Sequence, residues 1–209
     1  MIKRSLLLPL LLVAGGLHAQ DQALDLEKAK HTAETLCIAC HLADGNGINE
    51  LPTQPKLAAQ HADYLLKQMK EFKRWDGKPP VRENPSMNAM IDGLDEADMK
   101  AMAIYLSSQK LQPAFAREAN AETGKRIWRA GIAAKGVPAC AACHGPAGLG
   151  LPAQFPALAG QFPEYLEAQL KAFRDGVRTN DPASMMQSIA LKMTDPEIKA
   201  VSDYAAGLR

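Results

Sequence analysis

The sequence Cys-Ile-Ala-Cys-His at residues 37–41 recurs as Cys-Ala-Ala-Cys-His at residues 140–144, and this pair of motifs decides the fold. The two motifs use all four cysteines of the 209-residue chain. Four cysteines in a chain of this length do not make a disulfide-dense scaffold. The spacing of these residues, two thiols one helical turn apart followed directly by an imidazole, is therefore more informative than their number.

The sequence around the two motifs repeats as well. Residues 54–60 (QPKLAAQ) correspond to residues 155–161 (FPALAGQ) at an offset of 101. The same offset holds for the next helix, at Tyr64, Leu65, Gln68, Lys70 and Phe72. After a small deletion in the second half the offset becomes 99, which pairs Met87 with Met186 and Tyr105 with Tyr204. A chance motif would not bring this flanking register with it, so the chain is a tandem duplication.

The periodicity of apolar residues predicts an all-α chain. Glycine- and proline-rich loops follow each cysteine motif, and no alternating run predicts a sheet. We expect one domain over residues 20–110 and a second over residues 111–209, with the linker between them at residues 109–121, which contain Pro113. The expected helices cover residues 24–37, 62–75 and 95–108 in the first half and residues 122–134, 163–174 and 195–206 in the second.

The first 19 residues are typical of an export signal. Lys3 and Arg4 precede an apolar run over residues 6–13, and small residues follow up to Ala19. This run is shorter than the roughly 20 apolar residues that a membrane-spanning helix needs. We therefore expect a signal peptide over residues 1–19, cleaved near Ala19, and a periplasmic mature protein, with an uncleaved anchor as the alternative.

The overall composition excludes two classes of protein. The chain has 24 basic and 23 acidic residues, a balance that does not fit a nucleic-acid binder held by bulk charge. With 47% hydrophobic residues, it is also too apolar for a disordered chain. A globular protein with little net charge remains.

Each cysteine motif predicts covalent attachment of one haem. The thiols of Cys37 and Cys40 form thioethers with the two vinyl groups, and His41 presents an imidazole to the iron. Cys140, Cys143 and His144 repeat this arrangement. Three other interpretations fit less well. Structural zinc needs four gathered ligands, a thioredoxin-like pair needs a βαβ setting, and a disulfide leaves the repeated histidines unexplained.

A sixth ligand decides what the iron can do, because methionine or histidine favours electron transfer and an open position favours binding or catalysis. His31 and His61 have no histidine counterpart in the other half. Among the methionines, only Met87 and Met186 are methionine in both halves, and we expect both in a loop before the closing helix. These two are the candidate distal ligands, whereas Met99 and Met102 fit as core residues of the closing helix.

Taken together, these residues resemble the cytochrome c4 family, exported dihaem proteins built from two cytochrome c-type helical domains. The resemblance covers essentially the whole mature chain, including both motifs, residues 55–58 and 156–161, and the closing helices. It implies that Met87 and Met186 are the distal ligands, and that the carbonyls of Pro55 and Pro156 accept the Nδ1 protons of His41 and His144. The first half departs from the second at Ala59, which stands where the second half has Gly160.

The expected function is a one-electron carrier with two His/Met-ligated haem c groups, and not an enzyme. Expected partners are redox proteins, with a membrane terminal oxidase and a quinol-oxidising complex implied by the resemblance. Any membrane contact is expected to be peripheral. The alternatives are an electron-transfer subunit of a dehydrogenase or reductase complex, a dihaem peroxidase and a gas sensor. The last two need an open iron position, against which the repeated methionine argues.

Overall fold

The computed structural model describes residues 24–115 and 121–209. The expected signal peptide and part of the expected linker lie outside the described residues. Within them, two isolated β-bridges are the only strand-like pairings and every named element is a helix, which confirms the all-α class. No helix in the described part of the chain is both long and apolar enough to cross a membrane.

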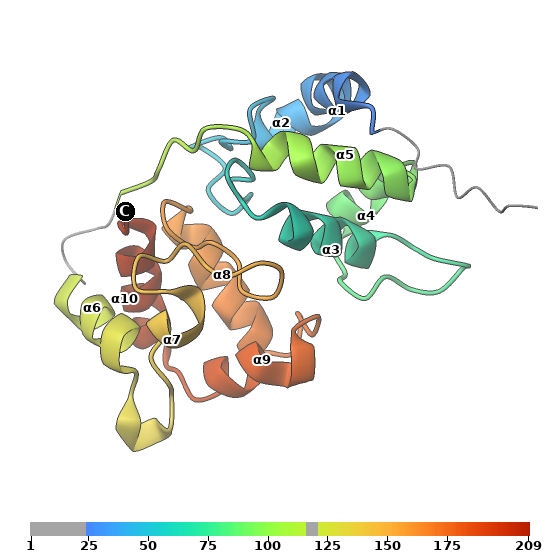
Figure 1. Ribbon diagram of the computed structural model, residues 1–209. Helices are drawn as coiled ribbons and strands as arrows, with labels where there is room; N and C mark the ends of the chain where they lie inside the picture. Colours follow the sequence, from blue (N-terminus) through green and yellow to red (C-terminus); the bar gives the residue numbers. More distant parts are fainter. Residues whose placement is uncertain (1–23, 116–120) are drawn as a thin grey trace, which may run out of the picture.

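The first half is built from a group of helices, and the loop after the first cysteine motif lies at one end of that group (Figure 1). The motif closes a continuous helical segment, in which a π-helical turn at Ala33–Cys37 separates α1 from α2. The helices of this half are α1 (Leu26–Thr32), α2 (Ile38–His41), α3 (Ala62–Phe72), α4 (Pro85–Asp92) and α5 (Glu96–Ser107).

The second half repeats this order. Two 3₁₀ turns, Ala133–Lys135 and Pro182–Ser184, precede α7 and α9 respectively. The helices are α6 (Ala121–Ala130), α7 (Ala141–His144), α8 (Pro163–Arg174), α9 (Met185–Ala190) and α10 (Asp195–Ala206). Both closing helices, α5 and α10, begin with a capping box, at Asp95 and Thr194, which satisfies the free backbone N–H groups of the first turn.

Each half has its own hydrophobic core. In the first, α5 packs on α1 and α3 and buries Met99 and Met102 completely or nearly so, as expected for core residues. In the second, α10 packs on α6 and α8 around Trp128 and Ile198. The crossing of α6 and α10 is tight at Gly124, where a Cβ atom would lie 2.2 Å from the carbonyl oxygen of Ala200. Each half of the duplication therefore has a core of its own.

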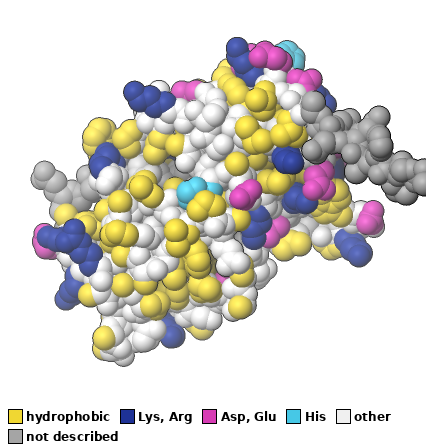
Figure 2. Space-filling model, in the orientation of Figure 1, with side chains coloured by type: hydrophobic (Ala, Val, Ile, Leu, Met, Phe, Trp, Pro, Cys, Tyr) yellow, Lys and Arg dark blue, Asp and Glu magenta, His cyan; other side chains and the backbone are white. Residues whose placement is uncertain are grey.

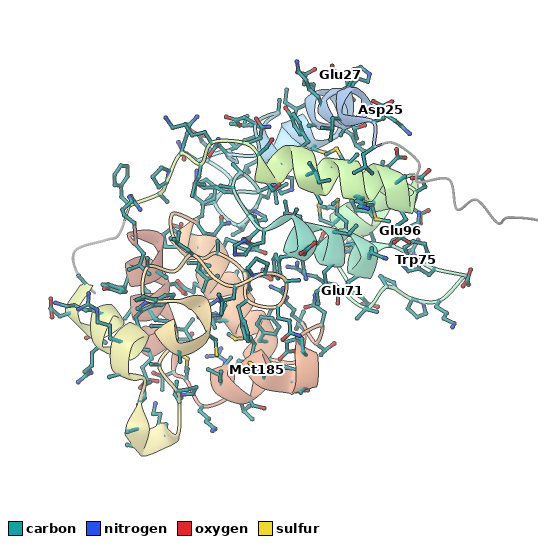
Figure 3. All side chains as sticks on the ribbon, in the orientation of Figure 1. Asp25, Glu27, Glu71, Trp75, Glu96 and Met185 are labelled. Carbon is teal, nitrogen blue, oxygen red and sulfur yellow. The ribbon has the colours of Figure 1, made fainter. Side chains whose placement is uncertain are left out.

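The two halves also touch directly, through hydrogen bonds from the loop after each motif. The side chain of Gln161 bonds to both backbone groups of Lys56, and the side chain of Gln60 does the same to Ala157. A second set of contacts joins α3 to the segment before α9, and Figure 3 shows Glu71 at the end of α3 that faces the second half. Its carboxylate accepts a hydrogen bond from Asn180.

The backbone at Ala59 carries a strain that its counterpart avoids. Ala59 has φ of +56° and Gly160 has φ of +72°, so both occupy the left-handed region. An L-residue pays roughly 1–2 kcal/mol there, more than the entropy that glycine loses on folding. We expect Ala59→Gly to raise the free energy of unfolding by up to about 1 kcal/mol, measured by denaturant titration of the haem-loaded protein.

The reverse substitution in the second half is the matched control. A Cβ atom at Gly160 would lie 2.8 Å from the Cβ of Pro113, so Gly160→Ala adds a clash to the left-handed strain. It should destabilise the protein by more than Ala59→Gly stabilises it. Equal unfolding midpoints for Ala59→Gly and the unaltered protein would contradict this account.

Candidate haem sites

The two cysteine motifs end in the same way. His41 is the last residue of α2 and His144 the last of α7, and both are more than nine-tenths buried. The next residue, Leu42 or Gly145, has a positive φ, which turns the chain sharply away. The sequence therefore places each imidazole at the point where a short helix opens into an irregular loop.

Each loop doubles back on its own histidine. In the first half the N–H of Gly47 donates to the carbonyl of His41 at 2.8 Å, and in the second the N–H of Gly150 donates to the carbonyl of His144 at 2.8 Å. Further along, the N–H groups of residues 57 and 58 bond to the carbonyl of Gly45, and those of residues 158 and 159 to the carbonyl of Gly148. The proline of the loop is thereby held beside the ring of the histidine.

The tautomer of both histidines follows from this contact. Nδ1 of His41 lies 2.8 Å from the carbonyl oxygen of Pro55, and Nδ1 of His144 lies 3.0 Å from that of Pro156. Because a carbonyl oxygen can only accept, Nδ1 carries the proton and Nε2 keeps a free lone pair. Burial lowers the pKa of both histidines, and the bond to the proline carbonyl opposes that shift. Neutral imidazole with a free Nε2 is the form that ligates iron.

None of the four cysteines, all of which lie in the described residues, is paired in a disulfide. Burial raises the pKa of Cys37 and of Cys140 to about 11, and the second thiol of each motif, Cys40 or Cys143, adds a smaller contribution in the same direction. In the described ranges, no three His, Cys, Asp or Glu side chains are gathered as a site for a bare ion. The uncommitted thiols and the oriented imidazole fit covalent attachment of a haem beside each histidine.

The structure corrects the expected setting of the two methionines. Met87 and Met186 were expected in a loop, but Met87 lies in the first turn of α4 and Met186 in that of α9. Asn84 explains the first of these helices, because its side chain accepts a hydrogen bond from the N–H of Met87 and Pro85 follows at the first helical position. Both methionines are half-buried, and Met87 packs against the core of the first half.

Sequence reasoning missed two arginines that join the halves, Arg82 and Arg178. The N–H of Arg82 donates to the carbonyl of Glu71, and that of Arg178 to the carbonyl of Ala172, both at 2.9 Å. Glu71 and Ala172 are 101 residues apart, so the two arginines are structural equivalents although they are 96 apart in the sequence. The longer loop of the first half, residues 73–81, hid this pairing. An arginine shortly after the repeated Phe72 or Phe173 was the available signal.

The two arginines form a crossed contact between the halves. The guanidinium of Arg82 lies 4.5 Å from the ring centre of Phe72 in its own half and reaches the hydroxyl of Tyr165 in the other at 3.3 Å. Arg178 does the same with Phe173 and Tyr64, and burial of its side chain leaves 8% exposed. This is the arrangement of a two-fold symmetric interface, in which each side makes the same contact.

The positive charges at this junction change the pKa of Tyr165. Burial alone would raise the pKa of Tyr165, but Arg82 and Arg178 bring it below its ordinary value because they stabilise the phenolate. His61 also joins the halves, through a contact of 2.8 Å between its Nε2 and the carbonyl oxygen of Leu149. The two halves are therefore held by polar side chains that the repeat analysis did not connect with function.

Comparison with known proteins gives the same result for both halves. The Cytochrome c family model matches residues 26–110 and again residues 121–208. Cytochrome c4 of Pseudomonas aeruginosa is 42% identical over 204 residues, which are 97% of this chain and 98% of that protein. The thiosulfate dehydrogenase electron acceptor of Thiomonas intermedia is 41% identical over 81% of this chain and 77% of its own length.

The solved structures agree with the sequence relatives. Reduced recombinant cytochrome c4 from Pseudomonas stutzeri superposes with a TM-score of 0.81 at 38% identity, covering 90% of this chain and 100% of that one. Two cytochrome c domains, each with its Cys-x-x-Cys-His motif, carry two covalently bound haem c groups and make the chain a dihaem electron carrier whose partners are redox proteins. The chain belongs to the cytochrome c4 family.

Proposed function

We propose that the protein is a periplasmic one-electron carrier in which each half closes both axial positions of its iron. His41 and Met87 are the axial ligands in the first half, and His144 and Met186 in the second. Cys37, Cys40, Cys140 and Cys143 form the thioethers. The observation that carries the proposal is the buried imidazole whose Nδ1 is held by a proline carbonyl in both halves, at 2.8 and 3.0 Å.

The contribution of the chain to electron transfer is rigidity. The haem supplies reversible one-electron exchange between ferrous and ferric iron. The proline carbonyl fixes the ring orientation of each histidine, and the first turn of α4 or α9 fixes the position of each thioether. Little rearrangement of ligands is then needed when the charge changes. The direct hydrogen bonds between the halves keep the two centres at one separation, which suits exchange of an electron between them.

We propose that the chain transfers electrons without transforming a substrate, because methionine in both halves leaves no open iron position. The proposed division is a signal peptide over residues 1–19 and domains over residues 20–110 and 111–209.

Exposed apolar side chains follow the second motif, at Leu149 and Leu151, which are 61% and 56% exposed. Such side chains on a surface with few charges favour brief docking of another redox protein. In Figure 2 the central part of the second half is mostly apolar or uncharged.

A dehydrogenase is a second candidate on the donor side. The relative from Thiomonas intermedia is named as the electron acceptor of thiosulfate dehydrogenase, and it is 41% identical to this chain. A quinol-oxidising complex as donor and a membrane terminal oxidase as acceptor are the alternative that the family suggests. Stopped-flow mixing of the oxidised protein with each purified donor distinguishes them, because the physiological donor reduces it fastest and with a salt-dependent rate.

One titration tests the ligand assignment. Reductive titration of the purified protein, followed by absorbance, should show two one-electron transitions and, in the oxidised protein, a weak thioether–iron band in the red for both haems. Carbon monoxide should not bind the reduced native protein, since both positions are closed. A colourless protein, or rapid uptake of carbon monoxide, would overturn the proposed function.

A further inference from the structure

The peptide group between Pro55 and Lys56 is hydrogen-bonded on both of its sides. Its carbonyl oxygen accepts from Nδ1 of His41 at 2.8 Å. Its N–H donates to Oε1 of Gln161, in the second half, at 2.8 Å. The peptide bond is trans, so its C=O and N–H groups point to opposite sides and the two hydrogen bonds lie roughly in line. The proximal histidine of the first half is thus connected to a side chain of the second half through a single peptide unit.

The second half contains the same arrangement with the roles exchanged. The carbonyl of Pro156 accepts from Nδ1 of His144 at 3.0 Å, and the N–H of Ala157 donates to Oε1 of Gln60 at 2.9 Å. Gln60 and Gln161 are 101 residues apart and are therefore repeat equivalents. Each glutamine supports the histidine of the other half and not that of its own.

The orientation of both glutamine side chains is fixed by a second bond. Nε2 of Gln161 donates to the carbonyl of Lys56 at 2.8 Å, and Nε2 of Gln60 donates to the carbonyl of Ala157 at 2.9 Å. Because a carbonyl can only accept, the oxygen and nitrogen of each amide cannot be exchanged. Only 8% of Gln60 and 6% of Gln161 is exposed, so water does not compete for these bonds.

A peptide group transmits polarisation from one hydrogen bond to the next. When its N–H donates to a strong acceptor, amide resonance puts more negative charge on its carbonyl oxygen, which becomes a better acceptor itself. A better acceptor at Nδ1 draws the proton away from the ring and makes the imidazole a stronger electron donor at Nε2. Stronger donation favours ferric over ferrous iron and lowers the reduction potential.

We infer that Gln161 and Gln60 are positioning residues that act across the junction, each setting the donor strength of the proximal histidine in the opposite half. The inference rests on the proposed ligation by His41 and His144. It deepens that function, because the potential of each haem then depends on the contact between the halves.

The test uses the haem-loaded protein and the variants Gln161→Met and Gln60→Met, which keep the side-chain length and remove the amide. In Gln161→Met the haem held by His41 should become easier to reduce, by about two- to fivefold in its equilibrium constant, or roughly 20–40 mV. The reduction potential of the haem held by His144 should change less. Gln60→Met should give the mirror result. Protein NMR of the oxidised state resolves the two haems and reports both potentials.

The mirror-image results expected for the two variants distinguish an effect carried through the peptide group from a general loosening of the junction. If the glutamines only hold the halves together, each variant loosens the same junction and shifts both haems alike. Equal shifts of the two reduction potentials in both variants, or no shift in either potential, would overturn the inference. The Nδ1 proton of His41 in the reduced protein provides a second readout, since its resonance should move upfield in Gln161→Met as its hydrogen bond weakens.

A variant of opposite sign keeps the inference testable should the methionine variants fold poorly. When ionised, the side chain in Gln161→Glu offers a stronger acceptor to the N–H of Lys56, although the bond to the carbonyl of Lys56 is lost. The potential of the haem held by His41 should therefore fall at pH values where the new carboxylate is ionised, and by more than that of the other haem. A rise, or a larger fall at the second haem, would contradict the inference. Loss of the red band in the unaltered protein would instead show that the proposed axial ligation is wrong.

Discussion

In Met87→His, both haems should remain covalently attached while one of them loses its thioether–iron band and becomes harder to reduce. Thioether sulfur favours ferrous iron and imidazole favours ferric iron, and axial ligands move haem potentials over a range of about 0.8 V. We expect the reduction potential of the altered haem to fall by more than about 100 mV, a modest part of that range. Redox titration followed by absorbance measures the band and the potential together.

Met90→His is the matched control for this variant. Met90 lies in the same helix, α4, and its side chain is 44% exposed, so histidine there should leave both red bands in place. Met186→His should reproduce the effect at the other haem, with the exposed Met185 as its control. If Met87→His and Met90→His gave the same spectrum, Met87 would not be the distal ligand of the first half.

Replacement of both thiols of one motif should remove one haem from the protein. In the variant Cys37→Ala/Cys40→Ala no thioether can form in the first half, whereas the second motif is untouched. Intact-protein mass spectrometry under denaturing conditions should find one haem and not two. The loss of apolar contacts around His41 should also lower the thermal stability of the first half.

Ala39→Ser changes the same motif and keeps both thiols, so it should retain two covalent haems. The corresponding double variant at Cys140 and Cys143 should also retain one haem, but in the other half. Two haems still attached in Cys37→Ala/Cys40→Ala would show that attachment does not follow the motifs.

The sequence predicted those parts of the fold in which local signals agree with packing. The bounds of α8 and α10 match the expected helices at residues 163–174 and 195–206, because Pro163 and Pro196 stand in the first turns and an apolar face runs through each helix. The helix expected at residues 24–37 was less accurate. A π-helical turn at Ala33–Cys37 interrupts it, and no local signal in the sequence marks such a turn.

Sequence reasoning missed the residues that act between the halves. Arg82 and Arg178 are equivalent in space but not in the aligned sequence, because the loop before Arg82 is longer. Gln60 and Gln161 were visible as a repeated pair, yet nothing in their spacing indicates a partner about 100 residues away. Hydrogen bonds across a junction depend on how two folded units dock, and no local pattern encodes docking.

The junction also shows what gene fusion permits. Lys56 places its ammonium group 4.2 Å from the ring centre of Phe162, while the symmetry-related positions hold Ala157 and His61. In a homodimer, one sequence must occupy both sides of the axis, so a cation facing an aromatic ring there faces one on the opposite side as well. Joining two copies in a single chain removes that constraint. The residues of each half at the junction can then diverge independently, and one polypeptide holds two haem sites that need not be alike.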